Sequence, residues 1–214
     1  MTVHPSLKLT YFELRSRAEP TRLALTIGGI PFVDERITMA QWATLKSKQP
    51  FGHVPVLTVN GTTQVAQSNG LLRYAGALTG LYPTADPLKA ALVDQIVFQV
   101  EDMYNMMYAT NNEGGPSNPM ARFLAREALG EKTFPPMFAA LDAVIAKHSS
   151  GTWCVGDSMT VADVALYAFV ATLKSGMFVG MPETVADAYP RVIRAFDGVA
   201  RHPRVVAWEA AHPL

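Results

Sequence analysis

The sequence predicts two units of different fold class, an α/β unit at residues 1–80 and an all-helical unit at residues 87–214. The first part alternates short β-rich runs with helical periodicity, whereas the second part shows helical periodicity only. Between them, the segment from Thr79 to Pro87 gathers a glycine and two prolines, a composition typical of a linker. We therefore expect a linker at residues 81–86.

Four strands and three helices are predicted in the first unit. Strands are expected at Leu7–Phe12, Phe32–Ile37, Pro55–Val59 and Thr62–Ala66, and helices at Ala18–Ile27, Ala40–Lys46 and Ser68–Leu78. The Gly28-Gly29 pair marks the end of the first helix, and Asn60-Gly61 indicates a hairpin that makes the last two strands antiparallel. The order β-α-β-α-β-β-α is typical of a thioredoxin-like domain with a four-stranded mixed sheet.

Two long helices open the second unit. They are predicted at Leu88–Asn112 and Pro119–Lys147, and the first ends before the breaker Gly114-Gly115-Pro116. Two or three shorter helices follow. One of them begins at Thr160, because Thr160 and Asp163 have the spacing of a capping box before an apolar run.

Composition and charge exclude several classes of protein. The chain carries 18 basic and 18 acidic side chains, so nothing indicates a nucleic-acid binder or attachment to a membrane by charge. No run of about 18 apolar residues is present, so we expect no membrane insertion. Charged residues within the first twenty break any signal peptide, and the single cysteine, Cys154, cannot form an internal disulfide. We therefore expect a cytoplasmic protein, with Cys154 packed as a small apolar residue.

The end of the first predicted strand is where thioredoxin-like redox proteins carry a Cys-x-x-Cys pair. The segment Phe12–Arg17 holds no thiol, which excludes disulfide exchange there. The position offers Tyr11 instead, whose hydroxyl can donate a hydrogen bond near the following helix. Such a donor would stabilise a thiolate.

The chain resembles the cytosolic glutathione transferases over nearly its whole length. Six fragments carry the resemblance, in order: Lys8–Phe12 with Arg15–Pro20; Trp42 with Lys46; Phe51–Leu57; Gln67–Asn69 with Leu72–Tyr74; Ala91–Asp94 through Glu101 and Asp102, which is similar to the pi class; and Val155–Asp157 with Thr160, Ala162 and Asp163. Each fragment is short, but their order and spacing agree with the predicted elements.

The resemblance implies a glutathione site. It makes Tyr11 catalytic, and it assigns glutathione binding to Arg17, Trp42, Lys46, His53, Val54, Pro55, Gln67 and Ser68, with Asp102 contributed by the partner subunit of a homodimer. An extended peptide can pair with the backbone at Val54, and a cis bond before Pro55 would turn that edge outward. His53 departs from the glutamine or lysine of relatives and brings a side chain that titrates near neutral pH.

Simpler roles stay open for several of these residues. Pro55 also suits an edge strand, Ser68 suits a plain N-cap, and Lys46 suits a solvated surface charge. Asp102 also suits a solvated helix face. Ser16 is a rival to Tyr11, because some glutathione transferase classes use a serine in this loop.

A dimer interface and a second substrate site are implied in the same way. Phe51 matches an aromatic that inserts between helices of the partner subunit, and Arg73 and Asp94 are candidates for an ion pair across the twofold axis. The hydrophobic electrophile is expected to meet Phe12, Met103, Met106, Met107 and Tyr108 between the two domains. Phe51 and the methionines at helical spacing are alternatively core residues.

The function that the resemblance implies is that of a homodimeric, tyrosine-type glutathione transferase with pi and sigma features. It would activate glutathione as a thiolate and conjugate it to hydrophobic electrophiles in detoxification. Three alternatives stay open: a glutathione-dependent isomerase of the prostaglandin D synthase kind, a non-catalytic carrier of hydrophobic ligands, and a structural, crystallin-like member. The histidine spacing indicates no metal site.

Overall fold

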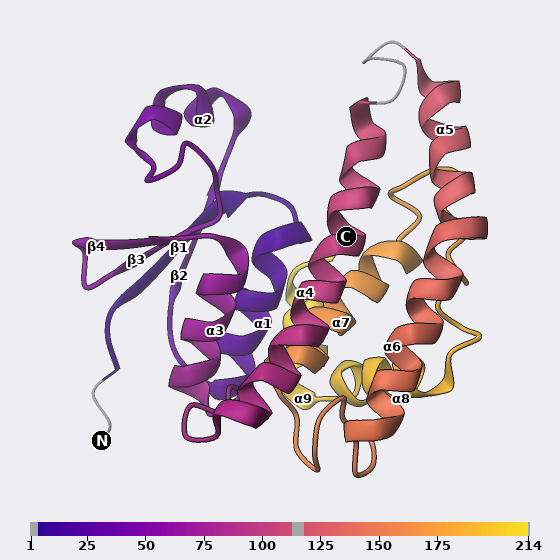
Figure 1. Ribbon diagram of the computed structural model, residues 1–214. Helices are drawn as coiled ribbons and strands as arrows, with labels where there is room; N and C mark the ends of the chain where they lie inside the picture. The colour runs from indigo at the N-terminus through magenta and orange to yellow at the C-terminus, as the bar shows by residue number, and fades with distance from the viewer. Residues whose placement is uncertain (1–3, 113–117, 214) are drawn as a thin grey trace. The chain divides into compact units, whose positions relative to one another are not determined.

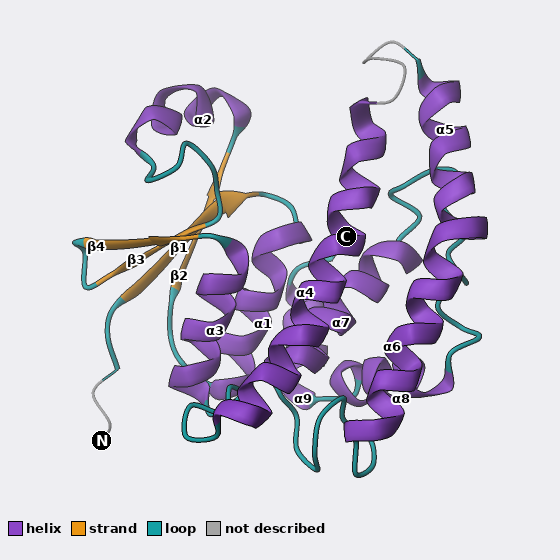
Figure 2. Cartoon of the chain, viewed as in Figure 1, coloured by secondary structure: helices purple, strands orange, loops and turns teal. Residues whose placement is uncertain are grey.

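The computed structural model describes residues 4–112 and 118–213, which form two compact units (Figure 1). The first unit comprises residues 4–84 and 202–213, and the described part of the second lies within residues 85–201. The four-stranded sheet belongs to the first unit, and the second is built of helices and loops (Figure 2). This confirms the predicted combination of an α/β unit and a helical unit. The predicted breaker at Gly114-Gly115-Pro116 lies outside the described residues.

The first unit follows the predicted order of elements. In sequence they are β1 (Leu7–Phe12), a short 3-10 turn η1 (Ser16–Ala18), α1 (Glu19–Gly28), β2 (Val33–Ile37), α2 (Met39–Leu45), η2 (Lys46–Lys48), β3 (Val56–Val59), β4 (Thr63–Ala66) and α3 (Ser68–Thr79). The sheet order is β2-β1-β3-β4, with β1 parallel to β2 and antiparallel to β3. Helices α1 and α3 pack side by side, and the strands separate them from α2 in Figure 1.

Two glycine-containing turns confirm the local predictions. Asn60 and Gly61 have φ values of +51° and +73°, and β3 and β4 pair across them as a hairpin. Gly28 ends α1, and a Cβ there would lie 2.1 Å from Thr79 Cγ2 on α3. Gly29 follows in the left-handed region at φ +70° as the C-cap. The Gly28-Gly29 pair therefore allows the close approach of α1 to α3 as well as the end of the helix.

The second unit is a bundle with one buried central helix. Its elements are α4 (Pro87–Ala109), η3 (Thr110–Asn112), α5 (Pro119–Ala128), η4 (Leu129–Thr133), α6 (Phe134–His148), α7 (Val161–Lys174) and α8 (Pro190–Ala200). Helix α7 contacts both α4 and α8 and is buried along most of its length. Phe169 of α7 packs among the rings of Tyr104, Phe134 and Phe138. These aromatic contacts form the centre of the bundle.

The helix predicted to run unbroken over Pro119–Lys147 contains a π-helical turn at Leu129–Thr133. Pro135 and Pro136 follow directly after it. Neither proline has an N–H to donate to a carbonyl four residues earlier, so the regular α-helical ladder cannot pass through them. The wider turn joins α5 to α6 without ending the helical path. The prediction of one regular helix is therefore corrected.

The capping box of α7 is present and buried. The Asp163 carboxylate accepts hydrogen bonds from the backbone N–H of Thr160 at 2.7 Å and of Cys154 at 2.6 Å. Burial raises the pKa of Asp163. Burial, and then the nearby Asp163 charge, raise the pKa of the Cys154 thiol well above its ordinary value. Cys154 is fully buried and uncharged, as a small packed residue should be.

The last helix, α9 (Pro203–Ala211), packs against α1 in the first unit, although its sequence position placed it with the helical part. The indole N–H of Trp208 donates to Glu19 Oε1 at 2.8 Å, and Arg204 donates to the Ile27 carbonyl at 2.8 Å. Helical periodicity gives the type of this element, but side-chain contacts decide which unit it joins.

A buried arginine holds the loop between β1 and α1. Arg22 has no exposed surface, and its guanidinium donates to the carbonyl oxygens of Phe12, Leu14 and Arg15. It also pairs with Glu19 at 3.2 Å and with Asp34 of β2 at 2.9 Å. One side chain thus fixes the backbone of the loop and forms ion pairs with two carboxylates.

We expect Arg22→Met to lower the free energy of unfolding by about 3–5 kcal/mol, because two carboxylates and three carbonyls lose a buried partner. Urea denaturation measures this loss. Arg201→Met is the matched control, since Arg201 forms an exposed pair with Asp197 and its side chain is 79% exposed; we expect a change within about 0.5 kcal/mol. Similar losses in the two variants would contradict the structural role of Arg22.

We expect Asp163→Asn to cost about 2–3 kcal/mol, because the amide group can accept from only one of the two buried N–H donors. Asp86→Asn is the control. Asp86 caps α4 by accepting from Lys89 N at 2.9 Å in an exposed setting, and asparagine caps helices about as well as aspartate. Thermal unfolding of both variants checks the difference, and equal melting temperatures would show that burial of the Asp163 carboxylate has no importance.

Candidate functional site

The sheet register brings three predicted site segments to one end of the sheet. Thr10 of β1 is paired with Val56 of β3, and Val56 with Ala66 of β4. Tyr11 follows Thr10, Pro55 precedes Val56 and Gln67 follows Ala66, so the three residues come at the same end of the antiparallel strands. The pairing of Phe12 with Ile37 brings the start of α2 to the same end. Residues more than forty positions apart in sequence, such as Thr10 and Val56, are neighbours here.

Tyr11 is held with its hydroxyl in a polar setting. Its side chain is 6% exposed, and its hydroxyl donates to Ser16 Oγ at 3.1 Å. The Arg22 guanidinium carbon lies 5.8 Å from the centre of the Tyr11 ring. Tyr11 thus presents a single hydroxyl donor at the end of β1, beside the loop that leads into α1.

The loop after β1 contains an unusual backbone conformation. Ser16 has φ +44°, a region that residues other than glycine rarely adopt, and it is 9% exposed. Gln67, directly before α3, has φ +75°. Such conformations persist where surrounding contacts impose them, and they gather at functional sites. Both lie at the end of the sheet that carries Tyr11.

The Val54–Pro55 peptide bond is cis, as the resemblance implies. Pro55 is buried, Val54 is half-buried and His53 is exposed. Strand β3 begins at Val56, so the backbone of Val54 lies outside the strand. This is the backbone segment expected to meet the peptide part of glutathione.

Gln67 and Ser68 form the start of α3. Gln67 is the N-cap residue and is exposed, and Ser68 is the first residue of the helix. The Gln67 side chain makes no capping hydrogen bond. The first N–H groups of a helix have no partner within it and favour a carboxylate. The segment can therefore offer backbone donors and side-chain polar groups to one anion.

Three of the residues expected to bind glutathione lie in α2, η2 and η1. Trp42 of α2 is half-buried, and its ring meets the edge of Phe12 at a centroid distance of 5.8 Å. The Thr38 and Gln41 capping box sets the start of α2 directly after β2. Lys46 follows the helix and is exposed, so its interpretation as a surface charge stays open, and Arg17 in η1 is half-buried.

The residues predicted from the second unit lie along α4. Asp102 is exposed and Asp94 is half-buried. Met103 and Met107 are fully buried, whereas Tyr108 is half-buried and stacks on Tyr104 at 6.0 Å.

The expected partner-contacting residues of the first unit differ in exposure. Phe51 is 63% exposed, and Arg73 of α3 is half-buried. An exposed phenylalanine of this kind is not a core residue of the chain by itself. Its role in a dimer and the roles of Arg73 and Asp94 stay predictions.

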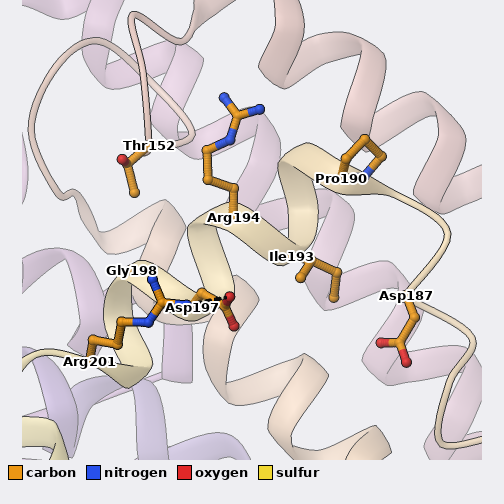
Figure 3. Close-up of a pocket in the computed structure, with 8 residues that line it drawn as sticks. All are labelled: Thr152, Asp187, Pro190, Ile193, Arg194, Asp197, Gly198 and Arg201. Carbon is orange, nitrogen blue, oxygen red and sulfur yellow. Dashed lines mark hydrogen bonds and ion pairs between the residues drawn. The ribbon is translucent and has the colours of Figure 1, made fainter.

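A pocket of about 450 Å³ lies along α8 in the second unit (Figure 3). Its charged groups already have partners: Arg201 pairs with Asp197 at 2.9 Å, Arg194 donates to the Gly151 carbonyl at 3.1 Å, and Asp187 pairs with Lys174. None of the residues predicted for glutathione lines it. The pocket offers no arrangement of a nucleophile and a base.

Within residues 4–112 and 118–213, no group of three or more histidine, cysteine or acidic side chains is arranged to hold a metal ion. Over the same part of the chain, no helix combines the length and the apolar character needed to cross a membrane.

Sequence reasoning missed Arg22. The glutamate and arginine at positions 19 and 22 have the spacing of an ordinary exposed helix pair, which suggests a solvated face. Nothing in the local pattern shows that this arginine is buried or that it donates to the carbonyl oxygens of the loop. The left-handed conformation of Ser16 was also not foreseen, since glycine is the residue that signals it.

Comparisons with known proteins agree with this geometry. The family models described as "Glutathione S-transferase, N-terminal domain" and "Glutathione S-transferase, C-terminal domain" match residues 7–76 and 102–212. Hematopoietic prostaglandin D synthase of Gallus gallus is 32% identical over 210 residues, which cover 98% of each chain. Glutathione S-transferase 1 of Ascaris suum is 30% identical over 214 residues, again 98% of each chain.

A solved structure shows the same fold. The structure of prostaglandin synthase D of Nilaparvata lugens matches with a TM-score of 0.84 and 26% identity, and the match covers 98% of this chain and 100% of that one. Family models, full-length relatives and the solved fold thus agree over both units. The chain belongs to the glutathione S-transferase family.

Proposed function

We propose that this protein is a glutathione transferase that activates glutathione as a thiolate and transfers its sulfur to hydrophobic electrophiles. One observation supports the proposal: the end of β1 at Tyr11, the segment that leads into β3 and the start of α3 after β4 lie at the same end of the sheet. A hydroxyl donor, a backbone segment beyond the end of a strand and a helix start that favours anions suit a small acidic thiol peptide. In this proposal the protein works in the cytoplasm, in detoxification.

Glutathione binds in an extended form along Val54. Its cysteinyl backbone pairs with the backbone there, and the cis bond to Pro55 orients that edge. The γ-glutamyl carboxylate meets Gln67 and Ser68 at the start of α3. The glycyl carboxylate meets cationic and indole donors from the other side of the site: Arg17, Trp42 and Lys46. His53 lies next to this backbone segment and is exposed.

Tyr11 stabilises the reacting sulfur. A free thiol with a pKa of about 8.5 is only a few per cent ionised at neutral pH. A hydrogen bond from the Tyr11 hydroxyl to the sulfur favours the charged form, and a pKa shift of about 2 units corresponds to about 2.7 kcal/mol. The thiolate then attacks an electrophilic carbon, a carbon–sulfur bond forms, and the leaving group departs with its electron pair.

The residues proposed to contact the electrophile differ in exposure. Of the four proposed residues, Phe12 and Tyr108 are partly exposed, whereas Met103 and Met107 are fully buried. Phe12 and Tyr108 therefore supply accessible aromatic surface, whereas Met103 and Met107 belong to the core of the helical unit.

The active form in this proposal is a homodimer. Phe51 inserts into the helical unit of the partner subunit, Arg73 and Asp94 pair across the axis, and Asp102 reaches the γ-glutamyl amine bound by the other protomer. The exposure of Phe51 and of Asp102 supports this arrangement, because both side chains are available to a second copy.

A glutathione-dependent isomerase is the second candidate function. The Gallus gallus relative that matches 98% of the chain is named as a prostaglandin D synthase. An isomerase would use the same thiolate without consuming it, so analysis of the products separates the two reactions.

Tyr11→Phe should lower kcat for glutathione conjugation by about 10- to 100-fold, because a hydrogen bond to a charged sulfur is lost. The KM for glutathione should change less than about threefold, since the peptide contacts remain. Turnover of a chromogenic aryl halide across pH measures both values. The pH at which kcat reaches half of its maximum should move upward. Tyr189→Phe is the control, because Tyr189 lies in the helical unit and its hydroxyl donates to the Pro135 carbonyl at 2.8 Å.

Other outcomes of this experiment favour other functions. If Tyr11→Phe turns over like the parent, Ser16 becomes the candidate for sulfur activation. If neither protein conjugates while both bind glutathione, the isomerase or the ligand carrier is favoured.

Phe51→Ser should convert the dimer to a monomer, since an inserted aromatic anchor is removed from the interface. Sedimentation measures the mass, and isothermal titration should show weaker glutathione binding because Asp102 of the partner is lost. Met39→Ser is the control: Met39 is 70% exposed on α2 and has no proposed interface role. A parent chain that sediments as a monomer would refute the dimer.

A further inference from the structure

Ser16 occupies a backbone position that suits glycine. Its φ of +44° lies in the left-handed region, where a Cβ is strained and glycine is not. The residue is also 9% exposed, so its hydroxyl is largely removed from solvent. A polar, strained and buried residue persists when the surroundings provide a compensating contact. That contact is expected to involve the hydroxyl.

The hydroxyl lies next to the proposed catalytic tyrosine. Ser16 Oγ and Tyr11 Oη are 3.1 Å apart, and both atoms are buried. The backbone that leads from one residue to the other is held by Arg22, which binds the carbonyl oxygens of Phe12, Leu14 and Arg15. The two hydroxyls are therefore fixed relative to each other before any ligand binds.

The direction of this hydrogen bond has to change when glutathione binds. The Tyr11 hydroxyl has one proton, which it donates to Ser16 in the structure. When that proton is donated to the sulfur, the Tyr11 oxygen still has lone pairs, and a serine hydroxyl can donate as well as accept. The Ser16 proton can then take the place between the two oxygens. No proton leaves either residue in this rearrangement.

We propose that Ser16 is a positioning residue for Tyr11, which donates to the tyrosine oxygen and so strengthens the hydrogen bond from Tyr11 to the thiolate. The inference rests on the proposed function and adds the Ser16 hydroxyl to the groups that stabilise the thiolate. Consecutive hydrogen bonds in a buried site polarise one another, so the outer donor stabilises the charged sulfur without contact with it. Ser16 acts through Tyr11, in contrast to a serine that binds the sulfur directly.

The test compares Ser16→Gly and Ser16→Ala with the parent chain, and the readout is the ultraviolet absorbance of the bound glutathione thiolate as a function of pH. Both variants lose the hydroxyl. The thiolate midpoint, the pH at which half of the bound glutathione is ionised, should therefore rise by about 0.5 pH unit. Below the midpoint, this corresponds to about threefold less thiolate. The KM for glutathione should change less than about twofold.

Thermal stability separates this effect from damage to the fold. Ser16→Gly should melt at the same temperature as the parent or higher, because glycine adopts φ +44° without strain. Ser16→Ala keeps the Cβ and should melt lower than Ser16→Gly. If Ser16 has only a structural role, the thiolate midpoints of the two variants should differ, as their melting temperatures do. The proposal predicts equal thiolate midpoints for the two variants.

The same substitution in the Tyr11→Phe background completes the test. If Ser16 acts through the tyrosine oxygen, Ser16→Gly should produce no further midpoint shift in that background. A further shift of similar size would show direct contact with the sulfur and overturn the proposal, as would an unchanged midpoint in the single variant. A parent chain that gives no thiolate signal with glutathione would overturn the proposed function as well, and so is distinguishable from failure of Ser16 alone.

Discussion

The buried guanidinium of Arg22 is the contact on which the site depends. It pairs with Glu19 and Asp34, has no exposed surface, and donates hydrogen bonds to three carbonyl oxygens of the loop after β1. An unpaired buried charge is costly, so the loop and the two carboxylates must keep their places once Arg22 is inside. Tyr11 and Ser16 stand at either end of this loop. The hydrogen bond between the Tyr11 and Ser16 hydroxyls therefore depends on the buried ion pairs of Arg22.

The same network connects the start of the chain to its end. Glu19 uses one carboxylate oxygen for Arg22 and the other for the indole N–H of Trp208 on α9. Arg15, in the loop itself, donates to the His212 carbonyl at 2.9 Å. The last helix is thus part of the support of the first loop. Its packing against α1 is a feature of the site as well as of the fold.

Much of the fold was predictable because its signals are local. Asn60-Gly61 gives a hairpin through the backbone freedom of these two residues, and the Thr160 and Asp163 spacing gives a helix start through two reciprocal hydrogen bonds. Tyr11 was identified as the candidate donor from its place at the end of a strand. The π-helical turn before Pro135 was missed, because helical periodicity continues across it while the hydrogen-bond ladder does not.

The sequence by itself determined the order of the elements, the division into an α/β part and a helical part, and the family, because hydrophobic periodicity, turn residues and short motifs act over a few positions. Only the tertiary structure decided that Arg22 is buried, that Ser16 meets Tyr11 in a left-handed conformation, and that α9 returns to α1. These features depend on contacts between segments far apart in the chain. The free energy that selects them, from burial of charge and from shared hydrogen bonds, exists only when those segments meet.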